Sequence, residues 1–168
     1  KSAFANDSDA IFTGASIKGK NGYNNVFFIG DEIHIRIDMF FNKPTGNIRL
    51  SFAVRNAEGL NIYHCVMEDS GFNPGTLNGH ASINVRFPSI SLYPGNYYIN
   101  DLWLASGAKT LDCIEGDILS FTIAEGGSKL SRRLASHKAV VHEIPEWTLA
   151  SCASYQKPPA AEGKLCSF

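Results

Sequence analysis

Residues 92–104, LYPGNYYINDLWL, decide the fold of this chain. Pro94 and Gly95 predict a turn, because proline fixes φ and glycine accepts positive φ. In the strand that should follow, successive side chains point to opposite faces. Strict alternation places one set on one face and the other set on the opposite face: Tyr97, Ile99, Asp101 and Trp103 against Tyr98, Asn100, Leu102 and Leu104. Both faces mix apolar and polar groups, which predicts a central strand with one side in the core and the other partly accessible.

Similar short segments flank this strand on both sides. Alternating or apolar runs separated by turn residues are found at 10–17, 26–29, 33–39, 48–55, 60–67, 83–87 and 119–123. A helical period is nearly absent. Many short strands in this arrangement predict an all-β protein, an antiparallel β-sandwich of the immunoglobulin-like or jelly-roll-like kind.

The sandwich should occupy only part of the chain. Residues 1–9 are polar and predict a flexible linker, and residues 10–127 contain the predicted strands. Residues 128–168 form a C-terminal extension with a short strand at about 138–143. Because the chain does not begin with Met, we expect it to be a piece of a longer protein.

The late strand must pair with an exposed sheet edge, since it follows a sandwich that already looks complete. That edge belongs either to the same chain or to a second copy. In the second case two subunits exchange strands within a homodimer. The sequence leaves both alternatives open.

Deletion of residues 128–168 separates these alternatives. Strand exchange predicts that the truncated chain becomes a monomer, because the exchanged element is gone. The measurement is molar mass by light scattering, with the intact chain as control. A dimer that survives truncation would exclude exchange as the basis of dimerisation.

Composition excludes several classes of protein. The net charge of −1 argues against nucleic-acid binding, which requires a basic surface. The four cysteines, Cys65, Cys113, Cys152 and Cys166, lack the spacing of a zinc site. We therefore expect no metal, reduced thiols and a cytoplasmic setting.

Catalytic and nucleotide-binding motifs are also missing. Residues 14–20, GASIKGK, fit the start of a phosphate-binding loop, but Asn21 stands where Ser or Thr would bind magnesium. The patterns GxSxG and HExxH are absent. Asp38 and Asp101 remain as one possible facing carboxylate pair for a glycosidase. We predict that the chain is not an enzyme and that it needs no cofactor.

The polar sides of the predicted strands are the remaining place for function. If these strands are neighbours, their side chains form one surface of guanidinium, amide and aromatic groups: His34, Arg36, Asp38, Arg49, Arg55, Asn84, Arg86, Tyr98 and Asn100. Such a surface suits a sugar, because rings stack on aromatic faces and an acidic substituent accepts hydrogen bonds from arginine. The alternative is an ordinary solvated sheet face. If this surface binds an anionic glycan, Arg36→Ala and Arg86→Ala should weaken binding without unfolding the chain.

Four segments, in order, carry a resemblance to a known family. They are FFIGDEIHIRIDMFF (27–41), NIRLSFAVRNAEGLNIY (47–63), VRFPSISLYPGNYYIND (85–101) and HKAVVHEIPEW (137–147). Together they resemble the C-terminal carbohydrate-binding domain of the Wzt type, which is attached to the ATPase subunit of ABC transporters that export O-antigen polysaccharide. The matching positions are Gly30, Asp31, Arg55, Asn56, Glu58, Gly59, Phe87, Pro88, Pro94, Gly95, Tyr97, Val140, Val141, Pro145 and Trp147.

The resemblance implies a β-sandwich without catalysis that dimerises and recognises the capped non-reducing end of the polysaccharide. It implies ATP only in a nucleotide-binding domain outside this sequence, and a transmembrane exporter subunit as partner. The implied location is the cytoplasmic side of the bacterial inner membrane. The matching motifs do not mark a pocket. The alternative is a dimerisation or interaction module without a ligand of its own.

Overall fold

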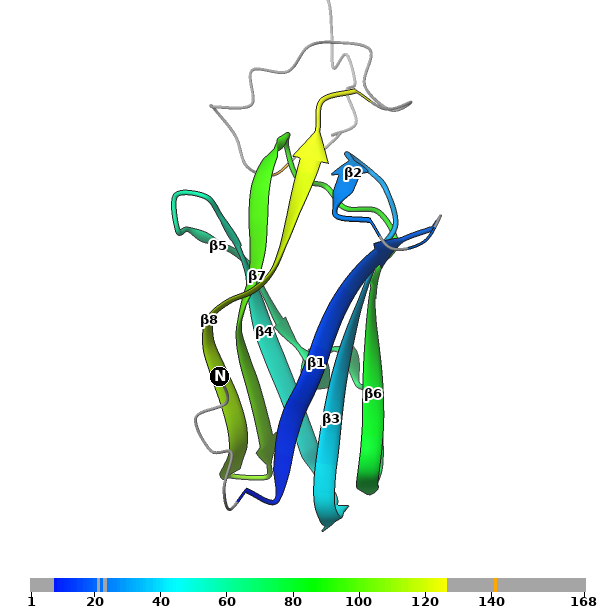
Figure 1. Ribbon diagram of the computed structural model, residues 1–168, viewed down its shortest axis with the longest axis vertical. Coiled ribbons are helices and arrows are strands. Elements are labelled where there is room, and N and C mark those ends of the chain that lie inside the picture. Colours follow the sequence, from blue (N-terminus) through cyan, green and yellow to red (C-terminus); the bar gives the residue numbers. More distant parts are fainter. Residues whose placement is uncertain (1–7, 21, 23, 127–140, 142–168) are drawn as a thin grey trace, which may run out of the picture.

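The computed structural model describes residues 8–20, 22, 24–126 and 141, and in this part of the chain β-strands dominate (Figure 1). The strands are β1 (Ala10–Gly19), β2 (Val26–Phe28), β3 (Ile33–Thr45), β4 (Ile48–Asn56), β5 (Asn61–Val66), β6 (Leu77–Phe87), β7 (Gly95–Ser106) and β8 (Lys109–Ala124). One short 3-10 helix, η1 (Met67–Ser70), follows β5. Within the described ranges, no helix is long and apolar enough to span a membrane.

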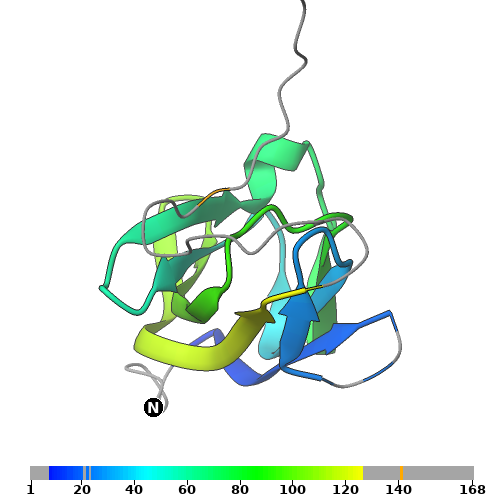
Figure 2. The ribbon, with the colours of Figure 1, turned by 90° about the horizontal axis from the view of Figure 1, so that it is seen from above.

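The strands form two sheets that pack face to face (Figure 2). Sheet A has the order β1-β3-β6, and sheet B has the order β2-β8-β7-β4-β5. All pairs are antiparallel except β2 with β8, which is parallel. The predicted β-sandwich is therefore confirmed.

The alternation in the sequence fills the space between the sheets. In β3 the residues Ile33, Ile35, Ile37, Met39 and Phe41 are all at most 1% exposed. They face Ile48, Leu50, Phe52 and Val54 of β4 in the same core. Because burial of one such side chain stabilises the fold by about 1.5–3 kcal/mol, this interleaved layer is the main source of stability.

The connection from β3 to β4 leads from sheet A to sheet B. The turn at Gly46 and Asn47 contains a left-handed residue, since Asn47 has φ 50°. Beyond it, β4 does not pair with β3 but lies between β7 and β5 in sheet B. The chain therefore distributes consecutive strands over both sheets, which determines where their polar sides lie.

β7 is the middle strand of sheet B, as the opening stretch predicts. The predicted positive φ at Gly95 is wrong, because Gly95 already belongs to β7 and pairs with Ile123. The ring of Tyr97 lies beside Gly95, and its hydroxyl donates to the carbonyl of Tyr93 at 2.8 Å.

Strict alternation along β7 is also wrong, because the strand contains a bulge at Asn100 and Asp101. Asp101 has a left-handed φ of 54°, and β7 uses one more residue than β4 between the pairs Ala53–Asn100 and Ser51–Trp103. The extra residue reverses the inward and outward positions. Tyr97 and Ile99 point inward before the bulge, and Leu102 and Leu104 point inward after it.

Asp112 joins the two sheets where β1 passes β8. Its carboxylate is fully buried and accepts hydrogen bonds from the backbone N–H groups of Phe12 at 2.8 Å and Cys113 at 2.9 Å. Ser8 and Asp9, which directly precede β1, also form contacts with other strands. The Ser8 hydroxyl donates to the carbonyl of Leu111, and Asp9 forms ion pairs with Lys43 and Lys109 at 2.7 Å.

The C-terminal extension lies outside the described residues except for Val141. Val141 forms an isolated antiparallel bridge with Leu92 of the same chain. Strand exchange between subunits remains a prediction. Of the four cysteines, the described Cys65 and Cys113 are free thiols, and burial raises the pKa of Cys65 to about 11.

Asp112→Ala should destabilise the sandwich. The substitution leaves two N–H groups without their carboxylate acceptor, so we expect a loss of about 2–6 kcal/mol, from about 1–3 kcal/mol for each donor. Urea unfolding followed by tryptophan fluorescence measures the change.

The matched control is Asp69→Ala in η1, where the carboxylate is exposed. A surface substitution of this kind changes stability by less than about 0.5 kcal/mol. Equal stability of the two variants would show that Asp112 does not hold the sheets together.

Candidate functional site

The nine residues selected from the sequence lie on two faces, not on one. Five belong to sheet A, on the side opposite its core residues: His34, Arg36, Asp38, Asn84 and Arg86. Four belong to sheet B: Arg49, Arg55, Tyr98 and Asn100. The prediction of one shared surface is therefore wrong, and the physical reason is the crossing from β3 to β4 between the sheets.

The sheet A residues are neighbours in the sheet, but their charges are already satisfied. Arg36 donates to Asp38 at 2.7 Å and to the hydroxyl of Ser82 at 2.9 Å. Glu32 accepts from Arg86 at 2.7 Å and lies 2.6 Å from the His34 ring. The hydrogen bonds from Arg86 and then His34 lower the pKa of Glu32 to about 2. This face is a network of internal ion pairs.

Asp38 and Asp101 do not form a catalytic pair. Asp38 lies on β3 of sheet A, and Asp101 lies on β7 of sheet B. Hydrogen bonds from Ser82 and Arg36 lower the pKa of Asp38, so its carboxyl is not poised as a general acid. The glycosidase alternative therefore has no support from this pair.

The outer face of sheet B carries two arginine–aromatic pairs. The guanidinium carbon of Arg49 lies 5.8 Å from the ring centre of Trp103, and that of Arg55 lies 5.5 Å from the ring centre of Tyr98. The bulge is the reason that Trp103 shares this face, because strict alternation places it with Tyr97. We define these four side chains, with Asn100 between them on β7, as the sheet B face.

Each arginine of the sheet B face also has a carboxylate partner. Arg49 donates to Glu68 of η1 at 2.8 Å. Arg55 and Asp117 form two parallel hydrogen bonds of 2.7 and 2.6 Å. The bond to Asp117 raises the pKa of Arg55, and the bond from Arg55 lowers the pKa of Asp117. The guanidinium charges are therefore balanced before any ligand binds.

Beside Trp103 the face is hollowed to a volume of about 350 Å³. Polar groups from three elements line the hollow, namely Arg49, Ser51, His64 and Glu68. The indole N–H of Trp103 donates to the Thr110 hydroxyl at 3.2 Å, which fixes the ring. A fixed aromatic ring bordered by donors and acceptors is suited to bind a polar ring-shaped ligand.

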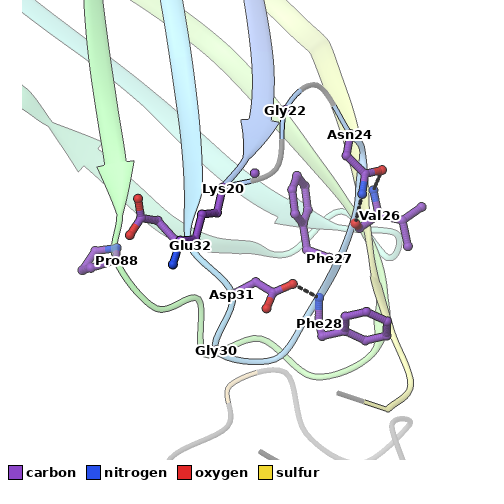
Figure 3. Close-up of a pocket in the computed structure, with 11 residues that line it drawn as sticks. Lys20, Gly22, Asn24, Val26, Phe27, Phe28, Gly30, Asp31, Glu32 and Pro88 are labelled. Carbon is purple, nitrogen blue, oxygen red and sulfur yellow. Dashed lines mark hydrogen bonds between the residues drawn. The ribbon is translucent and has the colours of Figure 1, made fainter. Parts of the chain in front are cut away.

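A larger hollow of about 670 Å³ lies at the end of the sandwich between β1 and β3, next to β2 (Figure 3). Its polar groups mostly serve local turns. Asp31 accepts from the Phe28 N–H at 2.8 Å, and Asn24 exchanges two hydrogen bonds with Val26. Because these groups are engaged in the backbone, we place the candidate site on the sheet B face.

Groups for a metal or nucleotide do not gather in the described ranges. No group of three His, Cys, Asp or Glu side chains there could hold a metal ion. Gly14 and its successors up to Gly19 lie on strand β1, so the GASIKGK segment does not have the strand-to-helix form of a phosphate loop.

Sequence reasoning missed Trp103 of the sheet B face and its neighbours His64, Glu68 and Asp117. Glu68 is contributed by η1, and His64 by the edge strand β5. Trp103 stands within the predicted strand, but the face on which its side chain lies depends on the bulge. A sequence signal for the bulge exists only in the succession Asn100-Asp101, two residues that tolerate left-handed backbone.

Comparisons with known proteins agree with this architecture. The family model described as Wzt C-terminal domain matches residues 5–134. Among solved structures, the crystal structure of the C-terminal domain of Wzt is similar with a TM-score of 0.68 at 12% identity, over 85% of this chain and 85% of that chain.

A second solved structure, a putative β-galactosidase from Bacteroides fragilis, has 12% identity and a TM-score of 0.40 over 69% of this chain and 17% of that chain. That likeness carries no argument here. No curated protein matches the chain significantly in sequence. The family model covers most of the chain, and the resemblance of the four segments points the same way: the chain belongs to the Wzt C-terminal domain family.

Proposed function

We propose that this domain binds the capped non-reducing terminus of an O-antigen polysaccharide and thereby selects the finished chain for export by an ABC transporter. Membership of the Wzt C-terminal domain family supports this function. The observation that carries it is the sheet B face, where the fixed Trp103 ring borders a hollow of about 350 Å³ that polar side chains also line.

The chemistry of the hollow fits a sugar residue. The apolar face of a sugar ring stacks on an indole, and its hydroxyl groups exchange hydrogen bonds with side chains at the rim. Arg49 and His64 supply donors there, while Glu68 supplies acceptors. A volume near the lower end of ligand pockets, about 300–1,000 Å³, suits the tip of a chain better than a long segment.

The paired arginines restrict how a charged cap binds. An anionic cap in the hollow either binds the Nη groups of Arg49 or replaces Glu68 as its partner, because the ion pair of 2.8 Å occupies only the guanidinium Nε. Both side chains are about 40% exposed, at 42% and 44%. Exposed pairs contribute only about 0–1 kcal/mol, so this exchange of partners costs little free energy.

In this proposal the domain acts by binding and not by catalysis, and it holds no cofactor. ATP is used by the nucleotide-binding domain of the exporter. The domain works as a homodimer on the cytoplasmic side of the inner membrane, together with the transmembrane exporter subunit. The family assignment supports this context.

The alternative function is dimerisation or interaction without a glycan. One observation favours it. Between the edge strands β5 and β6, where the sheets part, lies a largely apolar groove of about 310 Å³ lined by Phe52, Cys65, Met67 and Ile83. Phe72 lies at this groove and is 53% exposed. A second copy of the chain would cover this surface on dimerisation.

Trp103→Ala should weaken binding of the capped polysaccharide at least tenfold, because the stacking ring is lost. The matched control is Phe40→Ala, an aromatic truncation on the outer face of sheet A, where Phe40 packs against His80. Isothermal titration with capped and uncapped polysaccharide measures the affinity, and circular dichroism checks the fold.

The result also decides between faces and between functions. Loss of binding in Arg36→Ala and Arg86→Ala, with Trp103→Ala unaffected, would move the glycan to sheet A. If the unaltered chain binds neither the capped nor the uncapped polysaccharide, dimerisation remains as the function.

A further inference from the structure

Asn100 lies beyond the hollow, at the centre of the sheet B face. Its cross-strand partners are Ala53 on β4 and Asp117 on β8, so it lies between the two arginine–aromatic pairs. The side chain is only 5% exposed. Among the described residues, its Oδ1 atom is the one buried side-chain oxygen or nitrogen without a hydrogen-bond partner.

The orientation of this amide is fixed by its chemistry. The Nδ2 group donates to the Asp101 carboxylate at 2.8 Å, and a carboxylate can only accept. The other end of the amide, the carbonyl oxygen Oδ1, therefore faces away from Asp101. A buried acceptor without a donor is unfavourable, and such groups are rare in native proteins.

The Arg55–Asp117 ion pair explains the burial. Because β7 lies between β4 and β8, the pair crosses over β7 at Tyr98 and Asn100. Its two side chains are themselves 33% and 37% exposed. Because both side chains are partly exposed, a ligand can reach and displace the pair, and its displacement uncovers the oxygen of Asn100.

We infer that Asn100 Oδ1 is the hydrogen-bond acceptor for a hydroxyl group of a neutral sugar residue that sits over Tyr98, an inference that rests on the function proposed above. The hydroxyl donates to Asn100, and its neighbours on the sugar ring exchange hydrogen bonds with Arg55 and Asp117. The sugar ring takes the place of the guanidinium over Tyr98.

Charge defines the class of this ligand. Asp101 and Asp117 contribute two carboxylates around Asn100, while Arg55 contributes one positive charge. An ionised carboxylate has no donor to offer Oδ1, and carboxylate and phosphate groups are both repelled by the excess negative charge. A hydroxyl group can both donate and accept. The Asn100 subsite therefore takes a neutral sugar residue, next to the hollow that receives the tip.

NMR titration of the ¹⁵N-labelled chain tests this inference. The probes are neutral methyl glycosides, their mono-deoxy derivatives, methyl glucuronide and inorganic phosphate. The readouts are the Asn100 side-chain amide and the Trp103 indole N–H. We expect at least one neutral glycoside to shift both signals. Removal of one hydroxyl should raise its Kd about tenfold and abolish the Asn100 shift.

The variant is Asn100→Leu, and Asn78→Leu on the exposed side of β6 is its control. Asn100→Leu loses the hydrogen bond from Nδ2 to Asp101, but it breaks no bond at Oδ1, which has no partner in the free protein. The melting temperature should therefore fall by no more than a few degrees, while the Kd rises at least tenfold. The control should change neither quantity. A structural asparagine would show the reverse, with lost stability and unchanged affinity.

The titration distinguishes failure of this inference from failure of the proposed function. Glycosides that saturate the Trp103 signal without moving the Asn100 amide would refute the inference and leave the proposed function. The inference is also wrong, and the proposed function again stands, if phosphate or glucuronide is the probe that moves the Asn100 amide. Probes that move neither signal would refute the inference, and a capped polysaccharide that also moves neither signal would refute glycan binding itself. The deoxy comparison uses the unaltered chain, so it decides even if Asn100→Leu fails to fold.

Discussion

The left-handed backbone of Asp101 is the constraint on which both the core and the candidate site depend. Without the extra residue in β7, either the Tyr97–Ile99 half or the Leu102–Leu104 half would turn its apolar side chains to water. With it, both halves bury their side chains, and Trp103 joins Tyr98 on the outer face. Asp101 stabilises this geometry itself, since its carboxylate accepts from the N–H of Gly116 at 2.9 Å and from Asn100. One bulge thus satisfies the packing of the core and assembles the surface opposite to it.

The distribution of charge gives the two outer faces different characters. On sheet A, Arg36 and Arg86 are bound to carboxylates within a flat network. On sheet B, Arg49 and Arg55 are bound as well, but each lies over an aromatic ring. Rings supply stacking surface that ion pairs alone do not, and stacking is what a sugar requires. The difference between the faces is therefore in the aromatic groups, because both faces hold the same number of paired arginines among the predicted residues.

The sequence predicted the strands well and their neighbours poorly, for a physical reason. Alternation is local, so Ile33 to Met39 and Ile48 to Val54 were assigned correctly to buried sides of strands. Strand pairing is not local. β3 and β4 are separated by two residues in the chain but belong to different sheets, so Arg36 and Arg49 face opposite directions. The bulge escaped prediction because a left-handed residue in a strand is usually glycine, and here it is Asp101. The central position of β7, in contrast, was visible in its mixed faces.

The buried hydrogen bond between Phe12 and Asp112 has a consequence for folding during synthesis. The two residues are 100 positions apart in the chain, so β1 cannot complete its contacts until β8 exists. During synthesis, β1 therefore lacks its contact with β8 until β8 has left the ribosome. Pairings so distant in sequence form slowly, since a long loop must close before any contact stabilises it. Apolar surface that stays exposed in the meantime favours aggregation of the nascent domain.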